Sequence, residues 1–206
     1  MQVTSSSRIV LVSPKPPPIG GIARWTEIVL REVARRTGVI VHHVDTAPRW
    51  RSIHQVEPAR RVAGGALQGV RDFRRVAAAL RTPAAGIALT TSGHLGFIRD
   101  CVLLHLARTR GVPGYLHIRM GRLPEIVDRS NWESRLLDRA LNEAAGVVVL
   151  DGASRSALNS RLSSAKLHQI PNCVDLPPAS APERRRSDDS PELLYVGWIL
   201  PAKGVR

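Results

Sequence analysis

Hydrophobic residues follow two alternating patterns along this chain. Short runs rich in β-branched residues, such as 8–13 (RIVLVS) and 146–150 (GVVVL), are typical of buried parallel strands. Between these runs, apolar residues recur every three or four positions, which predicts helices with one buried face. The predicted strands are 8–13, 39–44, 86–90, 114–118, 146–150 and 166–170, and the predicted helices are 22–36, 67–80, 98–108, 132–143 and 153–162.

This alternation predicts an α/β fold, a Rossmann-like doubly wound parallel sheet covered by helices on both faces. Residues 49–61 are interpreted as irregular and basic. We expect a Rossmann-like domain over 1–176 and a linker over 177–191, where proline, serine and opposed charges replace apolar residues. Residues 192–206 contain LLYVGWILPAKG, an apolar run followed by a glycine-containing loop, and are interpreted as the first strand and loop of a second, truncated domain.

The charge balance narrows the range of partners. Lys and Arg together number 30 and Asp and Glu 17, a formal net charge of +13 that favours anionic partners. Aromatic residues make up only 4% of the chain, so nucleic acid is a disfavoured partner. Cys101 and Cys173 form no motif with each other, and no apolar stretch reaches the roughly 18 residues of a membrane span. These features favour a cytoplasmic protein.

The first candidate site is the loop PKPPPIGG, which precedes the predicted helix 22–36. Gly20 and Gly21 would allow a ligand to approach the backbone closely, and they permit a positive φ. The following helix N-terminus offers free N–H groups, which suit a phosphate or another anionic group. A glycine-containing turn without any ligand is the equally weighted alternative.

The second candidate is YLHIRMGR, where His117 and Arg119 lie at the carboxyl end of a predicted strand. Ligands of open α/β sheets bind beyond such ends, although a histidine there also occurs as a buried structural group. The third is IPNCVD over 170–175, a turn in which no neighbouring base would activate Cys173. The remaining histidines lack metal-ligand spacing, so no metal and no cofactor is predicted.

Five motifs in this order resemble the retaining family 4 glycosyltransferases of the GT-B fold. They are PPPIGGIARW, YLHIRMGRLPE, GVVVLDGASRSAL, IPNCVDL and LLYVGWILPAKGV, which span nearly the whole chain. The resemblance implies two Rossmann-like domains that face each other across a cleft. The N-terminal domain would mainly hold the acceptor, and the C-terminal domain would hold a sugar nucleotide.

The resemblance also implies roles for particular residues. Gly20 and Gly21 match a glycine loop that lies near the donor phosphates. Either His117 or Arg119 matches a histidine-containing acceptor-side motif, with the alignment ambiguous by two residues. Lys203 matches a lysine that pairs with the donor diphosphate.

The chain also departs from the family pattern. Trp198 stands where many members have a phosphate-binding arginine, and Asp151 stands where serine is common. Asn172 and Asp175 match a turn that is mainly a structural hallmark of the family. The acidic E-x7-E segment of the family lies farther along, in the C-terminal domain, for which this chain supplies no sequence.

We therefore expect the N-terminal half of a glycosyltransferase, inactive as this fragment. Its parent would transfer a sugar from a nucleotide-diphosphate donor to a hydroxyl of a glycan or lipid-linked acceptor, in glycan or polysaccharide biosynthesis. One alternative is a stand-alone acceptor-binding or partner-binding module of a split glycosyltransferase. Another is a peripheral module at the inner face of the membrane, which would meet anionic lipid through basic residues beside an apolar helical face, namely Arg71, Arg74, Arg75 and Arg81.

Overall fold

The computed structural model describes residues 7–17, 20–36, 38–48 and 58–173 of the chain. The predicted linker 177–191 and the predicted segment 192–206, with Trp198 and Lys203, lie outside these residues.

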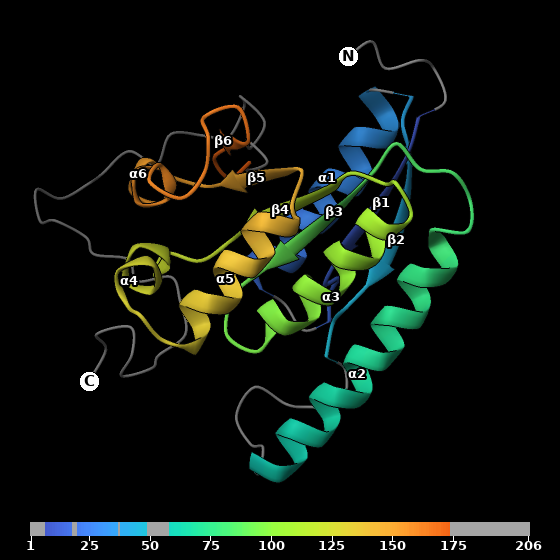
Figure 1. Ribbon diagram of the computed structural model, residues 1–206. Helices are drawn as coiled ribbons and strands as arrows, with labels where there is room; N and C mark the ends of the chain where they lie inside the picture. Colours follow the sequence, from blue (N-terminus) through green and yellow to red (C-terminus); the bar gives the residue numbers. More distant parts are fainter. Residues whose placement is uncertain (1–6, 18–19, 37, 49–57, 174–206) are drawn as a thin grey trace, which may run out of the picture. The chain divides into compact units, whose positions relative to one another are not determined.

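All strands of the described chain form one parallel sheet, in which strands and helices alternate (Figure 1). The strand order is β2-β1-β3-β4-β5-β6, which confirms the predicted α/β fold with a parallel sheet. The strands are β1 (Arg8–Ser13), β2 (Ile40–Asp45), β3 (Gly86–Thr91), β4 (Gly114–Ile118), β5 (Gly146–Val149) and β6 (Leu167–Gln169). The helices are α1 (Gly21–Arg36), α2 (Pro58–Ala79), α3 (Gly96–Thr109), α4 (Leu123–Asp128), α5 (Trp132–Glu143) and α6 (Gly152–Leu158).

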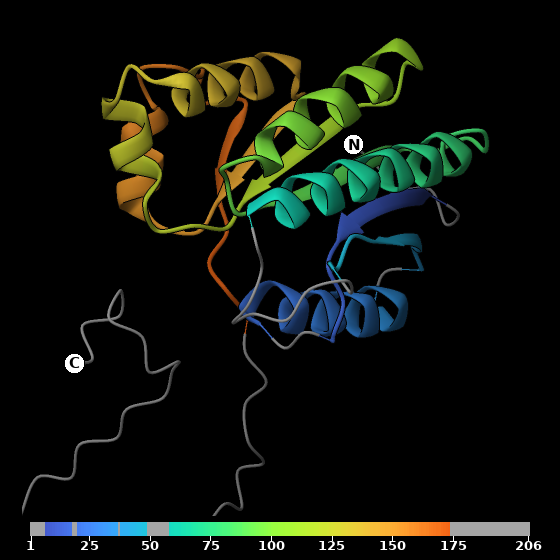
Figure 2. The same ribbon diagram turned by 90° about the horizontal axis from the view of Figure 1, so that it is seen from below.

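The strand order reverses direction at β1, and this reversal decides which helix covers which face. Connections between parallel strands are nearly always right-handed. The step from β1 to β2 runs one way along the sheet, and the steps from β2 onward run the other way. Accordingly, α1 lies on one face, whereas α2, α3 and α5 lie on the opposite face (Figure 2).

The hydrophobic core lies mainly between the sheet and the α2–α3–α5 layer. Alternate strand residues such as Leu89, Leu116 and Val147 are fully buried, and they belong to one cluster with Phe97 and Leu137 of the helices. Side chains of a strand alternate between the two faces of a sheet, so His117, next to Leu116, points to the α1 face. In the described part of the chain, no helix is long and apolar enough to span a lipid bilayer.

Two helices differ from the sequence-based expectation. Helix α2 begins at Pro58, nine positions before the predicted start at 67 (67 − 58), so the irregular interpretation of 49–61 is wrong for its last four residues. Proline is favoured in the first helical turn because its missing N–H has no intrahelical partner there. Gly64, Gly65 and Gly69 hide the apolar repeat of this helix. The six-residue helix α4 was not predicted, because it is too short to show a period.

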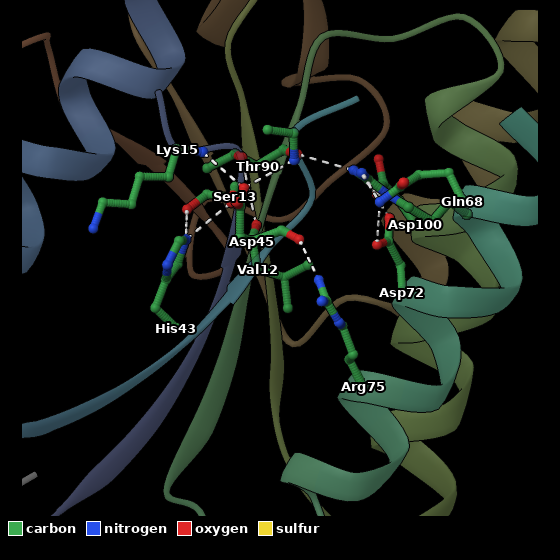
Figure 3. Close-up of polar contacts among 12 residues, drawn as sticks. Val12, Ser13, Lys15, His43, Asp45, Gln68, Asp72, Arg75, Thr90 and Asp100 are labelled. Carbon is green, nitrogen blue, oxygen red and sulfur yellow. Dashed lines mark hydrogen bonds and ion pairs between the residues drawn. The ribbon is translucent and has the colours of Figure 1, made fainter. Parts of the chain in front are cut away.

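A buried charge cluster joins α2 to the start of α3 (Figure 3). The carboxylates of Asp72 and Asp100 are both inaccessible to solvent. The guanidinium of Arg99 donates to Asp100 at 2.8 and 3.0 Å, and one of its nitrogens lies 3.9 Å from an oxygen of Asp72. Gln68 donates to the other oxygen of Asp72 at 2.7 Å. Burial raises the pKa of Asp72, although Arg99 and the Gln68 bond lower it. Arg99 therefore compensates two desolvated carboxylates.

Substitutions in this cluster are expected to have unequal effects. Arg99→Met leaves both carboxylates buried without a cation, and it should lower the free energy of unfolding by about 3–5 kcal/mol. Asp72→Asn keeps an acceptor for Gln68 and removes a charge that burial disfavours, so it should change stability by less than about 1 kcal/mol. Urea unfolding of both variants measures the contrast. Equal losses of stability in the two variants would contradict the role of Arg99 in compensating both carboxylates.

Candidate functional site

The candidate site lies at the carboxyl ends of the strands, where the order reverses between β1 and β3. In open α/β sheets, ligands bind in this region because the loops diverge on either side of the reversal. The loops that follow β1, β3, β4 and β6 contribute the residues described below. All of them belong to the same compact unit of the chain, Met1–Asp175.

His117, Arg119 and Trp25 pack against one another at this edge. Trp25 comes from α1, and its ring meets the His117 ring edge-on, with the centroids 5.0 Å apart. The guanidinium carbon of Arg119 lies 4.5 Å from the centroid of the Trp25 ring. The distance between a guanidinium nitrogen of Arg119 and Nε2 of His117 is 3.4 Å. A cation over an indole face is held by the quadrupole of the ring, so Trp25 fixes the position of Arg119.

The main chain and a distant turn also anchor Arg119. Its backbone N–H donates to the carbonyl of Thr91 at 2.9 Å, which extends the pairing of β4 with β3. One of its terminal nitrogens donates to the side-chain oxygen of Asn172, in the IPN turn after β6. Its Nε is buried without a hydrogen-bond partner in the described residues, and no ion pair to an acidic side chain joins Arg119 there. The positive charge is therefore held in place without being neutralised by the described part of the protein.

His117 is neutral in this environment. Burial, followed by the nearby positive charge of Arg119, lowers the pKa of His117 to about 4. Guanidinium nitrogens only donate hydrogen bonds, so Nε2 of His117 is the acceptor, and the ring proton lies on Nδ1. The site thus pairs an uncharged imidazole with a fixed cation.

The glycine loop lies one helical turn from the same cluster. Gly21 is the first residue of α1 and Trp25 is four residues further, so the two share a face of the helix. Neither Gly20 nor Gly21 has a positive φ, so the conformational reason for glycine at these positions does not apply. No described atom lies within 4 Å of a Cβ built at either position. A side chain here would occupy open space beside the helix N-terminus.

The loop after β3 is held rigidly beside this region. Gly93 and His94 both have positive φ, 83° and 54° respectively. The N–H of His94 donates to Oε1 of Glu133 at 2.7 Å, and the buried Glu133 also forms an ion pair with Arg122. Burial raises the pKa of Glu133, but the bonds from Arg122 and His94 outweigh it and bring the pKa below its usual value. A Cβ at Gly93 would lie 2.7 Å from Sδ of Met120, a flexible side chain that could shift, so the positive φ is the main reason for glycine here.

Ser13, His43 and Asp45 have the residue types of a catalytic triad, but their hydrogen bonds have a structural role (Figure 3). Nε2 of His43 lies 2.9 Å from the carbonyl oxygen of Ser13 and 3.3 Å from its hydroxyl. A carbonyl only accepts, so Nε2 carries a proton and cannot take one from the hydroxyl. Oδ1 of Asp45 accepts from the backbone N–H groups of Lys15 and Ala47, at 3.0 and 2.9 Å. Asp45 thereby fixes the loops after β1 and β2.

Other residues singled out by the sequence have structural roles in the described chain. Asp151 caps α6, where its side chain accepts from the N–H of Ser154 at 2.8 Å. Cys101 is buried, and burial followed by the nearby Asp100 raises the pKa of its thiol to about 11, so it is unreactive near neutral pH. Cys173 is exposed. Among the described residues, no group of three or more His, Cys, Asp or Glu side chains could hold a metal ion.

The structure brings together four residues from three of the motifs singled out in the sequence. His117 and Arg119 come from YLHIRMGR, Trp25 follows the glycine loop, and Asn172 belongs to the IPN turn. His117 and Arg119 were predicted from the sequence and Asn172 was placed in a structural turn, but Trp25 was given no role. The position of Trp25 one turn after Gly21 was the available signal. Lys203 and Asp175 lie outside the described residues.

Comparison with known proteins identifies no family for this chain. No protein-family model matches the chain, and no curated protein matches it in sequence. Among solved structures, it is similar to the 2-deoxyribosyltransferase of the psychrotolerant bacterium Bacillus psychrosaccharolyticus. The TM-score is 0.36 and the sequence identity 13%, over 82% of this chain and 100% of that one. This distant likeness says nothing about the site, whose chemistry is argued from its own residues.

The lowered pKa of His117 predicts a pH dependence of stability. Between pH 6.5 and about 4, the unfolded chain binds a proton at His117 that the folded chain does not bind. The free energy of unfolding should therefore fall as the pH is lowered through this window, by up to roughly 3 kcal/mol from this group. Urea unfolding at several pH values gives the free energy of unfolding as a function of pH. Between pH 6.5 and 4, this free energy should fall less steeply for His117→Phe than for the native chain.

The exposed His168 provides the matched control, because it lies on the edge strand β6. His168→Gln should keep the slope of the native chain. Parallel slopes for the native chain and His117→Phe would contradict a neutral, buried His117.

Proposed function

We propose that the described domain is the acceptor-binding side of a sugar-nucleotide-dependent glycosyltransferase, of the kind that the family 4 resemblance implies. The observation that carries this proposal is the fixed, unneutralised Arg119 beside a neutral His117 at the carboxyl edge of the sheet. In this proposal, a second Rossmann-like domain supplies the donor-binding residues. The described domain alone then binds acceptor without transferring sugar.

The neutral imidazole suits a hydroxyl-bearing ligand. Nε2 of the neutral His117 accepts from Arg119, so the Nδ1–H of the ring remains as a donor and can bind the oxygen of a sugar hydroxyl. His117 is therefore assigned to the acceptor hydroxyl.

The uncompensated guanidinium suits an anionic group close to that hydroxyl. Arg119 keeps its charge although burial lowers its pKa, because guanidinium groups stay protonated in proteins. Besides the bonds to His117 and Asn172, each terminal nitrogen has a second N–H, and these could form the paired bonds with which arginine binds phosphate or carboxylate. A phosphate of a lipid-linked acceptor or a carboxylate of an acidic glycan has the required chemistry.

The glycine loop extends the same site toward a second anionic group. The first N–H groups of α1 have no intrahelical acceptor, and the positive end of the helix dipole lies there. The open space beside Gly20 and Gly21 would admit a phosphate close to these N–H groups. This arrangement supports the role that the resemblance implies for the loop, near the donor diphosphate.

We expect Arg119→Met and Gly21→Ala to weaken ligand binding while the domain stays folded. Arg119→Met removes charge-assisted hydrogen bonds and should weaken binding of an anionic glycan by roughly 10- to 100-fold. Gly21→Ala fills open space in a helical turn, so stability should change by less than about 0.5 kcal/mol while binding of inorganic diphosphate weakens. A glycan array that includes polyprenyl-diphosphate-linked sugars, calorimetry with diphosphate and thermal unfolding measure these three effects.

Arg155→Met is the matched control, since Arg155 is an exposed arginine of α6. The proposal fails if the chain binds no glycan on the array, or if Arg119→Met and Arg155→Met bind alike. A separate assay incubates the native chain with UDP-, GDP-, ADP- and dTDP-linked hexoses and the bound glycan. Sugar transfer by the described domain without a second domain would contradict the assignment to the acceptor side alone.

A further inference from the structure

The outer surfaces of α2 and α3 carry large apolar side chains that the fold leaves in solvent. On α2, the exposed fractions are 73% for Leu67, 51% for Val70 and 39% for Phe73. At the start of α3, they are 56% for Leu95, 47% for Ile98 and 47% for Val102. Single exposed apolar residues are ordinary, but a contiguous set of them marks an interaction site. We call these six residues the α2–α3 patch.

The six residues form one surface because the two helices are packed side by side in the same layer (Figure 1 and Figure 2). Arg99 of α3 meets the buried Asp72 of α2. Further along both helices, Arg110 at the C-terminal end of α3 donates to the carbonyl of Ala77. The two helices therefore run in the same direction.

The charges around the α2–α3 patch have one sign. Asp72 and Asp100 are the acidic residues of 63–81 and 95–110, and both are fully buried against Arg99. Arg71, Arg74 and Arg81 are exposed, and none of them forms an ion pair in the described part of the chain. The outward face thus presents apolar side chains beside uncompensated positive charge.

We propose that the α2–α3 patch binds an anionic membrane surface. Arginines attract acidic phospholipid headgroups, while Leu67, Val70 and their neighbours can enter the boundary between headgroups and acyl chains. A second copy of the chain is disfavoured as the occupant, because it would bring arginines against arginines. Nucleic acid is disfavoured because five of the six patch residues are aliphatic and offer no stacking surface.

This proposal does not depend on the proposed function. The α2–α3 patch lies on the outer surface of the helices that cover one face of the sheet, whereas His117 points to the opposite, α1 face. One end of the patch reaches the loop after β3, because Leu95 directly follows His94.

The test is flotation of the full chain with vesicles of phosphatidylcholine, with and without phosphatidylglycerol. We expect binding only when phosphatidylglycerol is present, and weaker binding as salt is raised. Arg71→Gln with Arg74→Gln should lower vesicle affinity by roughly fivefold for each arginine. Leu67→Ser with Val70→Ser should lower it by roughly tenfold, at unchanged net charge. These side chains are exposed, so thermal unfolding should show that each pair of substitutions leaves the fold intact.

Arg35→Gln with Arg155→Gln is the control, because it removes the same charge from exposed positions on α1 and α6. This control pair should bind vesicles like the native chain. The proposal is overturned if the native chain binds no acidic vesicles, or binds neutral vesicles equally well. It is also overturned if the control pair weakens binding as much as the Arg71 and Arg74 pair. Sedimentation velocity without lipid tests whether a second copy of the chain binds the patch instead. If the native chain self-associates and the pair Leu67→Ser with Val70→Ser abolishes this, the patch binds a second copy and the proposal is overturned.

Discussion

The reversal of strand order at β1 is the constraint on which the site depends. Right-handed crossovers place α1 on the face of the sheet opposite α2, α3 and α5. The Trp25 side chain therefore comes from the α1 face and meets His117, whose own side chain points to that face of β4. Without the reversal, the helix that follows β1 would lie with the others, and neither His117 nor Arg119 would have an aromatic partner. The topology of the sheet thus decides the environment of both polar groups.

Most of the fold could be predicted from the sequence, because each strand is a short β-branched run and each long helix has an apolar repeat. The expected range 132–143 coincides with α5, and 8–13 coincides with β1. The site was predicted only in part. His117 and Arg119 could be identified because they end a strand, which is a local property. Their contacts with Trp25 and Asn172 could not, because these depend on which face α1 covers and on how the turn after β6 meets β4. Such contacts join distant segments of the chain, and no local pattern encodes them.

The electrostatics of the described domain follow from how it uses its acidic residues. Several of its carboxylates accept hydrogen bonds within the fold: Asp45, Glu133 and Asp151 from backbone N–H groups, Asp72 from Gln68, and Asp100 from Arg99. Each of these bonds fixes a loop or a helix end, which is a local structural task. A carboxylate used in this way is a poor counter-ion for the surface, because burial and geometry hold it away from exposed cations. Exposed arginines such as Arg71 and Arg74 therefore have no ion-pair partner among these carboxylates.

Arg119 differs from the surface arginines because its side chain is fixed in one conformation. The indole of Trp25 and the side chain of Asn172 fix the guanidinium, and the neutral His117 beside it adds no negative charge. A flexible arginine on the surface loses side-chain entropy when it binds an anion, whereas one already fixed loses little. We therefore expect Arg119 to bind an anion more strongly than any single exposed arginine of α2. The exposed arginines suit a diffuse partner such as a lipid surface, and Arg119 suits a single, well-placed anionic group.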